Sequence, residues 1–329
     1  MASSAVGPSG DPTLLRGKAP PFGPLGALLL AALVLAGLWL RLRGLAAEGF
    51  ADDEVHKWLA ALRYLHGDFG GDDLEHPMLM KGLVALATLA LRSKLPLEAL
   101  TRLPSALAGG LTVFATALLG RRLFGRAAGL LAAGLLAFST TAIGYQRIAK
   151  EDSLLALFFV LCLWCLCEAR AAAEDRRDEE RARFEWLAAL FLALAFACKY
   201  FIFYFPIPVL AYLWLRPVSA WRVPFSRWLA LTAFAFLVFL ALNFAVLLPS
   251  SWSYYARFLG GEHVGGDRGV SESILFMGRL YGNLAFARDG SPFYYYPVFF
   301  AVKLATPTVI LTALGLALAL ARRAPAHRV

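Results

Sequence analysis

Three carboxylates stand next to one another at Asp52, Asp53 and Glu54, and His56 follows two positions later. A carboxylate acts as a general base when it reaches a hydroxyl that must lose its proton. The same residue types cap helices, since Asp is a favoured N-cap and acidic side chains suit the first helical turn. Capping uses one carboxylate or two, so this run leaves at least one for chemistry. We take Asp53 and Glu54 as the candidate catalytic residues.

A second group of candidates, Glu75, His76 and Lys81, lies in the later string LEHPMLMK. A residue before proline is pushed away from helical geometry, and proline is favoured in the first turn of a helix. Lys81 is therefore predicted one turn inside a helix that Pro77 opens. Such a lysine either holds a positive charge at a binding site or snorkels from an interfacial helix to water.

The elements that carry these residues belong to a membrane protein. Of the 329 residues, 59% are hydrophobic and 17% are charged, and the mean hydropathy is +0.62. Soluble domains average about 45–50% apolar and about 25% charged residues, so a soluble enzyme, a disordered chain and a nucleic-acid-binding protein are poor fits. The net charge of +9 reports loop topology instead. The predicted fold class is an all-α, polytopic membrane helix bundle.

Eight apolar runs are candidates for transmembrane spans, each of which needs about 20 mainly apolar residues. They cover residues 24–40, 103–119, 127–145, 153–167, 186–199, 201–215, 228–248 and 293–321. The two short runs 186–199 and 201–215 are predicted to form a hairpin with Lys199 and Tyr200 at its outer corner. A ninth run, Met78–Leu91, has only 14 residues, and we predict that it lies on the membrane surface. After the acidic run, Trp58, Leu59, Leu62 and Leu65 recur at helical spacing, which predicts a second surface helix that ends near Gly67.

Basic residues set the predicted orientation. With the N-terminus inside, the inner segments carry 16 of the 32 Lys and Arg residues in 68 positions, and the outer segments carry 15 in 115 positions. This asymmetry follows the positive-inside rule. Arg41 and Arg43 directly follow the first span, which favours an uncleaved anchor over a cleaved signal peptide.

The domain organisation follows from these spans. Residues 1–23 are predicted to be a disordered cytoplasmic N-terminus, 24–321 a transmembrane catalytic domain, and 322–329 a basic cytoplasmic tail. Two long outer loops, 41–102 and 249–292, contain four of the five histidines. Because long loops in compact proteins tend to carry function, the outer face is the predicted working face.

The two motifs together resemble a known family. Asp53-Glu54-Val55-His56, followed by His76-Pro77-x-Leu79-x-Lys81, is similar to the first extracytoplasmic loop of the protein O-mannosyltransferases, glycosyltransferase family 39, which have the GT-C fold. Met78 stands where the family has a second proline. Further similar segments are Arg147-Ile148-x-x-x-Asp152, Lys199-Tyr200, Phe293-Tyr294-Tyr295-Tyr296-Pro297 and Lys303-x-x-x-Pro307. Glu262-His263 and Arg268 have the spacing of the lipid-phosphate site in the related aminoarabinose transferases.

This resemblance implies a polyprenyl-phosphate sugar donor, from which mannose or another hexose moves to an acceptor hydroxyl on the outer face with inversion. A phosphate leaving group departs as an anion, so one carboxylate base suffices, whereas a glycosidase needs a carboxylate pair. Asp53 is the expected base, and Glu54 is expected to position the acceptor or that carboxylate. The residues expected to hold the lipid phosphate are His76, Lys81, Lys199, His263 and Arg268. The supporting residues are His56, Glu75, Arg147, Asp152, Tyr294, Tyr295 and Tyr296.

Several alternatives stay open at this point. Tyr294–Tyr296 either anchors the chain at the membrane interface or contacts the donor. A divalent cation is a candidate cofactor, because Asp53, Glu54, His56, Glu75 and His76 offer oxygen and nitrogen ligands, although the resemblance does not require one. The acceptor is a protein, a lipid or a glycan, and the expected location is a bacterial inner membrane with the site facing the periplasm. The rival functions are aminoarabinose transfer to lipid A, a lipid or sugar transporter, and a non-catalytic membrane scaffold.

Overall fold

The structure is a computed structural model that describes residues 18–70, 74, 76–200, 206–215, 221–259, 273–282 and 290–323. The helices are α1 (Gly23–Leu42), α2 (Asp52–Leu65), α3 (Leu79–Leu91), α4 (Leu97–Phe124), α5 (Arg126–Ala137), α6 (Thr140–Gln146), α7 (Glu151–Glu174), α8 (Asp178–Phe196), α9 (Pro206–Leu215), α10 (Phe225–Leu242), α11 (Pro249–Leu259), α12 (Tyr295–Lys303) and α13 (Thr306–Arg323). A short 3-10 helix covers Phe244–Leu247, and strands β1 (Ser273–Phe276) and β2 (Arg279–Gly282) form an antiparallel hairpin.

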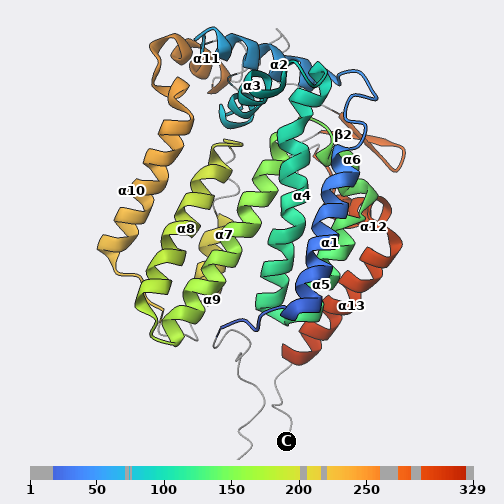
Figure 1. Ribbon diagram of the computed structural model, residues 1–329, viewed down its shortest axis with the longest axis vertical. Helices are drawn as coiled ribbons and strands as arrows, with labels where there is room; N and C mark the ends of the chain where they lie inside the picture. The colour runs from blue at the N-terminus through green and yellow to red at the C-terminus, as the bar shows by residue number, and fades with distance from the viewer. Residues whose placement is uncertain are drawn as a thin grey trace, which may run out of the picture.

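The long helices form a bundle, and three shorter ones cover one of its ends. Helices α1, α4, α7, α8 and α10 run along the long axis, whereas α2, α3 and α11 lie across the upper end (Figure 1). The beginning of α1 and the end of α13 both lie at the lower end. This arrangement confirms the predicted all-α membrane bundle and the surface helices of the first outer loop.

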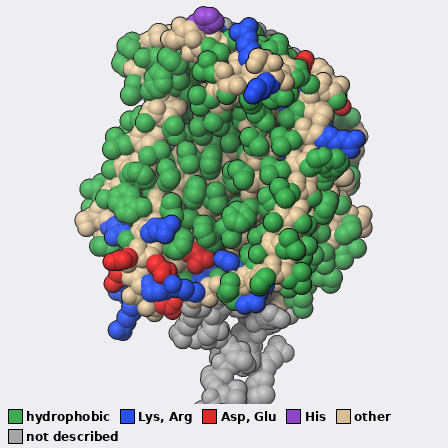
Figure 2. All heavy atoms as spheres, viewed as in Figure 1, with side chains coloured by type: hydrophobic (Ala, Val, Ile, Leu, Met, Phe, Trp, Pro, Cys, Tyr) green, Lys and Arg blue, Asp and Glu red, His purple; other side chains and the backbone are tan. Residues whose placement is uncertain are grey.

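The exposed surface of the bundle is apolar along its middle. Hydrophobic side chains cover the central part of the visible face, and charged side chains gather mainly at the lower end (Figure 2). Helix α10 illustrates the pattern, since Phe236 and Leu237 are both largely exposed. A surface of this kind is stable when lipid tails cover it, because exposing so many apolar side chains to water is unfavourable.

Four described helices, α1, α4, α7 and α10, are long and apolar enough to cross a membrane, and a fifth span is obtained if α5 and α6 are counted as one. Helices α5 and α6 together occupy the predicted run 127–145, but they are bent by 61°. Ser139 produces the restart, since its hydroxyl accepts the Ala142 N–H as an N-cap of α6 at 3.3 Å. The last predicted run, 293–321, is likewise divided into α12 and α13.

The surface helix predicted after the acidic run is present as α2. Trp58 is buried, and Leu62 and Leu65 pack against the same apolar cluster, while Leu59 of the predicted apolar face is exposed. The helix ends before Gly67, whose φ of +77° is a conformation that glycine adopts without strain. The 78–91 run forms α3, which packs on α2 and α4 at the end of the bundle as predicted.

A buried arginine ties α1 to the break between α5 and α6. Arg41 is fully buried, and its guanidinium donates to the Gln146 side chain at 2.6 Å and to the carbonyls of Leu136 and Ala137 at 3.0 and 3.2 Å. Gly109 of α4 makes room for Gln146, because a Cβ at that position would lie 2.7 Å from the amide. The upper end of α1, from which the first outer loop departs, is therefore fixed in the bundle.

Candidate active site

Glu54 and Arg102 form a buried ion pair at the base of the first outer loop. The Arg102 Nε donates to Glu54 Oε1 at 2.8 Å and Nη2 donates to Oε2 at 2.6 Å. The remaining guanidinium hydrogens reach the carbonyls of Leu45, Glu48 and Gly49 at 2.6 to 2.9 Å. Bidentate pairs of this kind fix both partners in one geometry. The pair joins α4 to α2 and to the chain that precedes α2.

Glu54 also caps α2. Its Oε2 accepts the Ala51 N–H at 2.8 Å, which is the carboxylate half of a capping box, and Oε1 accepts the Ala149 N–H at 2.8 Å. Burial alone raises the pKa of Glu54, but the hydrogen bonds from Arg102 and from the two backbone amides hold that pKa below its ordinary value. Glu54 is completely buried and faces protein on every side, and these hydrogen bonds keep it ionised.

Asp53 is the neighbouring carboxylate that remains open to solvent. Its side chain is 59% exposed, and its Oδ2 accepts a hydrogen bond from the Lys150 ammonium at 2.8 Å. That hydrogen bond is the main reason that the pKa of Asp53 lies below its ordinary value; partial burial opposes it, and the charges of Lys150, Lys57 and His76 add to it. Asp53 is thus an ionised carboxylate at the surface of a rigid frame.

Residues 149–152 reach the site from the chain between α6 and α7. The backbone N–H of Ala149 holds Glu54, and the side chain of Lys150 holds Asp53. The backbone of Lys150 is fixed in turn by the buried Ser105, whose hydroxyl donates to the Lys150 carbonyl at 2.8 Å and accepts its N–H at 3.1 Å. Both neighbouring carboxylates are therefore held by consecutive residues of one segment.

The next two residues of this segment, which begin α7, make two further ion pairs. Glu151 lies 3.4 Å from the Lys57 ammonium, and both side chains are buried. Asp152 Oδ1 accepts from Lys199 Nζ at 2.9 Å. Acidic residues in the first turn of a helix are also favoured by the helix dipole. The 149–152 segment thereby links α2 to the corner after α8.

Lys81 lies below His76 and does not snorkel. Only 1% of Lys81 is exposed, and its Nζ donates to the His76 carbonyl at 2.9 Å. The interpretation of Lys81 as a snorkelling lysine is therefore wrong, because its ammonium is inside the protein. The His76 side chain is half-buried and lies close enough to Asp53 for its charge to lower the pKa of that carboxyl.

Met78, which departs from the family motif, ties the first outer loop to the end of α10. Its N–H donates to Asn243 Oδ1 at 3.1 Å, and its sulfur accepts the Ala245 N–H at 3.3 Å. Asn243 is completely buried and donates to the Tyr200 hydroxyl at 2.8 Å, which also lies 3.0 Å from the Tyr255 hydroxyl. Proline has no N–H, so the proline that the family motif has here would lose the first of these bonds.

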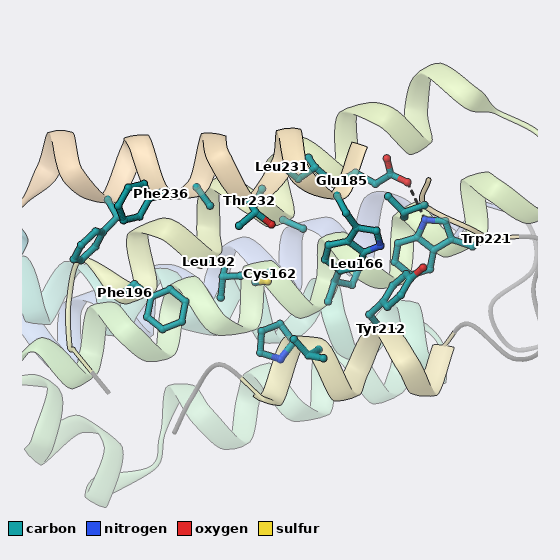
Figure 3. A pocket seen from close by; sticks show the side chains of 18 of the residues that line it. Cys162, Leu166, Glu185, Leu192, Phe196, Tyr212, Trp221, Leu231, Thr232 and Phe236 are labelled. Atoms are coloured by element: carbon teal, nitrogen blue, oxygen red, sulfur yellow. Dashed lines mark hydrogen bonds between the residues drawn. The ribbon is translucent and has the colours of Figure 1, made fainter. Parts of the chain in front are cut away.

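An apolar cavity of about 450 Å³ lies between α7, α8, α9 and α10. Tyr212 and Trp221 lie toward one end of it, and Phe196 and Phe236 lie toward the other (Figure 3). Glu185 is the charged residue of the lining; it accepts a hydrogen bond from the Trp221 indole at 2.9 Å and forms an ion pair with Arg227. The lining also includes Tyr200, the residue after Lys199.

The other predicted site residues lie in different places. Arg147 supports the end of α1, where its Nη2 donates to the Gly44 carbonyl at 2.8 Å, and His56 is exposed on α2. Tyr294, Tyr295 and Tyr296 begin α12, where the rings of Tyr294 and Tyr295 lie 5.9 and 5.0 Å from that of Phe276 in the hairpin. The hydrogen bonds and ion pairs of the described residues do not connect these tyrosines to Asp53.

Three predicted site residues, Glu75, His263 and Arg268, lie outside the described residues. Within the described ranges, no group of three or more His, Cys, Asp or Glu side chains is arranged to hold a metal ion. Glu75 was one of the proposed ligands, so the divalent cation stays a prediction.

The motifs did not single out Arg102, Lys150 or Asn243. Arg102 and Lys150 lie 48 and 97 residues from the carboxylates that they contact, and Asn243 lies 165 residues from Met78. Arg102 directly precedes the predicted run 103–119, and a charged residue at that boundary was the available signal, because charged residues in membrane helices are usually paired or functional. Lys150 stands inside the Arg147-Ile148-x-x-x-Asp152 motif, at a position that the motif leaves unspecified.

The chain is similar to known glycosyltransferases. The family model described as dolichyl-phosphate-mannose-protein mannosyltransferase matches residues 75–246, which is more than half of the chain. No curated protein matches in a sequence comparison. Among solved structures, the S. cerevisiae protein O-mannosyltransferase Pmt1–Pmt2 complex bound to the sugar donor matches with a TM-score of 0.54 and 20% identity, over 76% of this chain and 36% of that chain.

The structural match shows that the fold is shared, and the chain spans about a third of the length of that solved relative. The family match begins at Glu75, so it includes His76, Lys81 and Lys199 together with the whole 149–152 segment. Asp53 and Glu54 precede the matched residues, so their assignment to the site depends on their contacts in the structure. Because the family model covers most of the bundle that holds the site, the chain belongs to the dolichyl-phosphate-mannose-protein mannosyltransferase family.

Proposed function

We propose that the protein is a membrane glycosyltransferase that moves a hexose, most simply mannose, from a polyprenyl-phosphate donor to an acceptor hydroxyl. The observation that carries the proposal is the exposed, ionised carboxylate of Asp53, which stands on the buried Glu54–Arg102 frame with cations around it. The family match and the shared fold support the same reaction class. The matched family, the dolichyl-phosphate-mannose-protein mannosyltransferases, also favours mannose and a protein acceptor.

The chemistry needs one base and several positive charges. The acceptor oxygen attacks the anomeric carbon from the face opposite the phosphate, the bond from that carbon to the phosphate oxygen breaks, and the electron pair leaves with the phosphate. Asp53 takes the proton of the acceptor hydroxyl. Such a displacement inverts the anomeric centre. The leaving phosphate gains negative charge, which preorganised cations stabilise.

Glu54 acts by positioning Asp53. It is completely buried and bound on both oxygens, so its role is to fix the first turn of α2, from which Asp53 projects. Catalytic groups held within a fraction of an ångström by such supports are far more effective than mobile ones. Of the two roles expected for Glu54, positioning the carboxylate fits this burial.

The donor phosphate is proposed to lie near His76, Lys81 and Lys199, and the polyprenyl chain in the α7–α10 cavity. The cavity is lined mainly by apolar side chains, and Tyr200 joins it to Lys199 at the outer corner of the bundle. The lining residues from Glu185 to Phe196 span about 16 Å of α8 at 1.5 Å per residue, which suits several isoprene units. We further propose that the site faces the outside of the cell, in a bacterial inner membrane.

The experiment that tests this function is a transfer assay with radiolabelled polyprenyl-phosphate donors. Membranes that contain the protein are supplied with mannose, glucose or aminoarabinose donors, and the product is separated as protein, lipid or glycan. Labelled protein from the mannose donor is the expected result. Label in lipid A from the aminoarabinose donor supports the rival transferase, and movement of the intact donor across sealed vesicles without transfer supports a transporter.

Lys81→Met is expected to raise the KM for the donor about 10- to 100-fold, with less than a threefold change in the KM for the acceptor. A hydrogen bond from a charged group contributes about 1.5–3 kcal/mol, and this substitution removes the charge while keeping the volume. Steady-state kinetics with each substrate varied in turn measure the split. Lys94→Met is the control, because Lys94 is exposed beyond α3 and lies outside the site. A larger effect on the acceptor would remove Lys81 from the phosphate site.

Ala235→Phe is expected to weaken the use of a long-chain donor about tenfold and to leave a donor with two isoprene units unaffected. Ala235 lines the cavity, so a phenylalanine ring there would overlap a bound polyprenyl chain. Overpacking of this kind is expected to weaken donor binding by about 1–3 kcal/mol. Ala233→Phe is the matched control, because Ala233 is exposed on the same helix and does not line the cavity. Equal losses with both donors would place the polyprenyl chain elsewhere.

A further inference from the structure

We propose that the Lys150 ammonium exchanges between two anions during the reaction: it pairs with Asp53 in the donor-free protein and moves to the donor phosphate when the donor binds. The exchange frees the Asp53 carboxylate for the acceptor hydroxyl only once the donor is in place. This inference rests on the proposed function, and it assigns a role to a residue outside the motifs that suggested that function.

The geometry of Lys150 suits an exchange. Its backbone N–H and carbonyl are both hydrogen-bonded to the Ser105 hydroxyl. Its side chain is 38% exposed and pairs with the Asp53 carboxylate, which is itself 59% exposed. An ion pair between two such exposed groups is weak, because water competes for both charges. A phosphate can therefore draw the ammonium away at small cost while the backbone stays in place.

Three other cations near the site are held more firmly. Lys57 is buried against Glu151, and Arg102 is buried with Glu54 and three carbonyls. Lys81 is buried beneath His76. Removing a buried charge from its partner leaves an uncompensated ion, which is strongly destabilising. Among these cations, Lys150 is the one that can change partners at the surface.

The charges that face the pair make the exchange useful. Asp53 faces Lys150, Lys57 of its own helix and His76 before α3, and the pairing with Lys150 is the first cause of its lowered pKa. A carboxylate that is bound to an ammonium is a weak base, and departure of the ammonium raises its pKa when a base is needed. The donor phosphodiester becomes a monoester and gains negative charge, which the arriving ammonium stabilises.

Lys150 is also faced by acidic groups that would draw it back. Asp53 raises its pKa first by a hydrogen bond, against the opposing effect of partial burial, and Asp53, Asp152 and Glu151 add charge. Asp152 and Glu151 are engaged with Lys199 and Lys57. Lys150 therefore stays protonated in both positions, and release of the phosphate returns it to Asp53.

The first test measures binding of a long-chain polyprenyl monophosphate to the purified, full-length protein. Asp53→Asn is expected to tighten binding about two- to fivefold, because the competing carboxylate charge is removed. Lys150→Met is expected to weaken binding about tenfold or more. In the double variant, Asp53→Asn should bring no gain over Lys150→Met alone.

The outcomes separate the exchange from the proposed function. Wild-type protein that does not bind the lipid phosphate contradicts the proposed function and the exchange together. Binding that is indifferent to Lys150→Met, or an Asp53→Asn gain that persists with Met at position 150, contradicts the exchange alone. Lys150→Arg keeps the charge and should bind within about threefold of the wild type, which separates loss of the ammonium from a general loss of structure.

The second test is the pH profile of transfer, where transfer needs the ionised form of Asp53. At low donor concentration, kcat/KM for the acceptor is expected to fall at a higher pH in Lys150→Met than in the wild type as the pH is lowered. The reason is that the Asp53 carboxyl has lost the partner that lowers its pKa. At saturating donor the two limbs should coincide, because Lys150 has left Asp53 in the wild type as well. Limbs that stay apart at saturating donor would show a fixed ion pair.

Discussion

Asp53→Asn is expected to slow sugar transfer about 10²–10⁴-fold, which is the usual contribution of a positioned general base. The substitution keeps the shape of the side chain and removes its ability to accept a proton. Because Asp53 is exposed and its ion pair with Lys150 is worth at most about 1 kcal/mol, the protein should stay folded and membrane-inserted. Single-turnover transfer from pre-bound donor measures the chemical step directly.

The control for Asp53→Asn is Asp68→Asn. Asp68 is an exposed carboxylate beyond the end of α2, where it accepts the Gly70 N–H at 3.2 Å, and an asparagine can accept the same bond. Its variant should transfer sugar within about twofold of the wild type. Equal rates for Asp53→Asn and the wild type would show that Asp53 is not the base and that another residue takes the proton.

Arg102→Met is expected to destabilise the protein by about 3–5 kcal/mol and to abolish transfer. The substitution leaves the completely buried Glu54 ionised, with only two backbone amides to replace a bidentate guanidinium. Breaking one side of a buried ion pair is strongly destabilising, because the remaining charge is uncompensated. It also removes the hydrogen bonds that Arg102 donates to the carbonyls of Leu45, Glu48 and Gly49 before α2. Thermal unfolding in detergent, followed alongside transfer, measures both effects.

A surface ion pair supplies the comparison. Asp178, the first residue of α8, pairs with Arg181 at 3.2 Å, and its side chain is largely exposed. Asp178→Asn should change the unfolding free energy by no more than about 0.5 kcal/mol. If Arg102→Met were as stable as Asp178→Asn, the Glu54–Arg102 pair would not be the frame on which the position of Asp53 depends.

The local features of the site could be predicted from sequence. The acidic run marked the start of α2, Gly67 marked its end, and the interrupted 14-residue run marked α3 as a surface helix. These features depend on neighbours within one or two turns, for which propensities and capping preferences are informative. The capping interpretation proved correct for Glu54, and it left Asp53 as the accessible carboxylate.

The pairing across the bundle could not be predicted in the same way. Arg102 and Glu54 meet because α4 and α2 pack at the same end, and a single sequence does not record which charged residue meets which. The broken spans had a similar cause: run 127–145 is mainly apolar and contains no charged residue, whereas its bend follows from Ser139 capping a new helix. Hydropathy measures the cost of crossing a membrane and is insensitive to where the backbone turns.

The 149–152 segment has a consequence for how this protein tolerates change in length. Loops usually accept insertions and deletions, because few contacts depend on their register. Here four consecutive residues hold four different partners on α2 and beyond α8. Loss of one residue would shift every contact by one position and place a carboxylate where an ammonium is needed. Among relatives, this stretch should therefore vary in residue type before it varies in length.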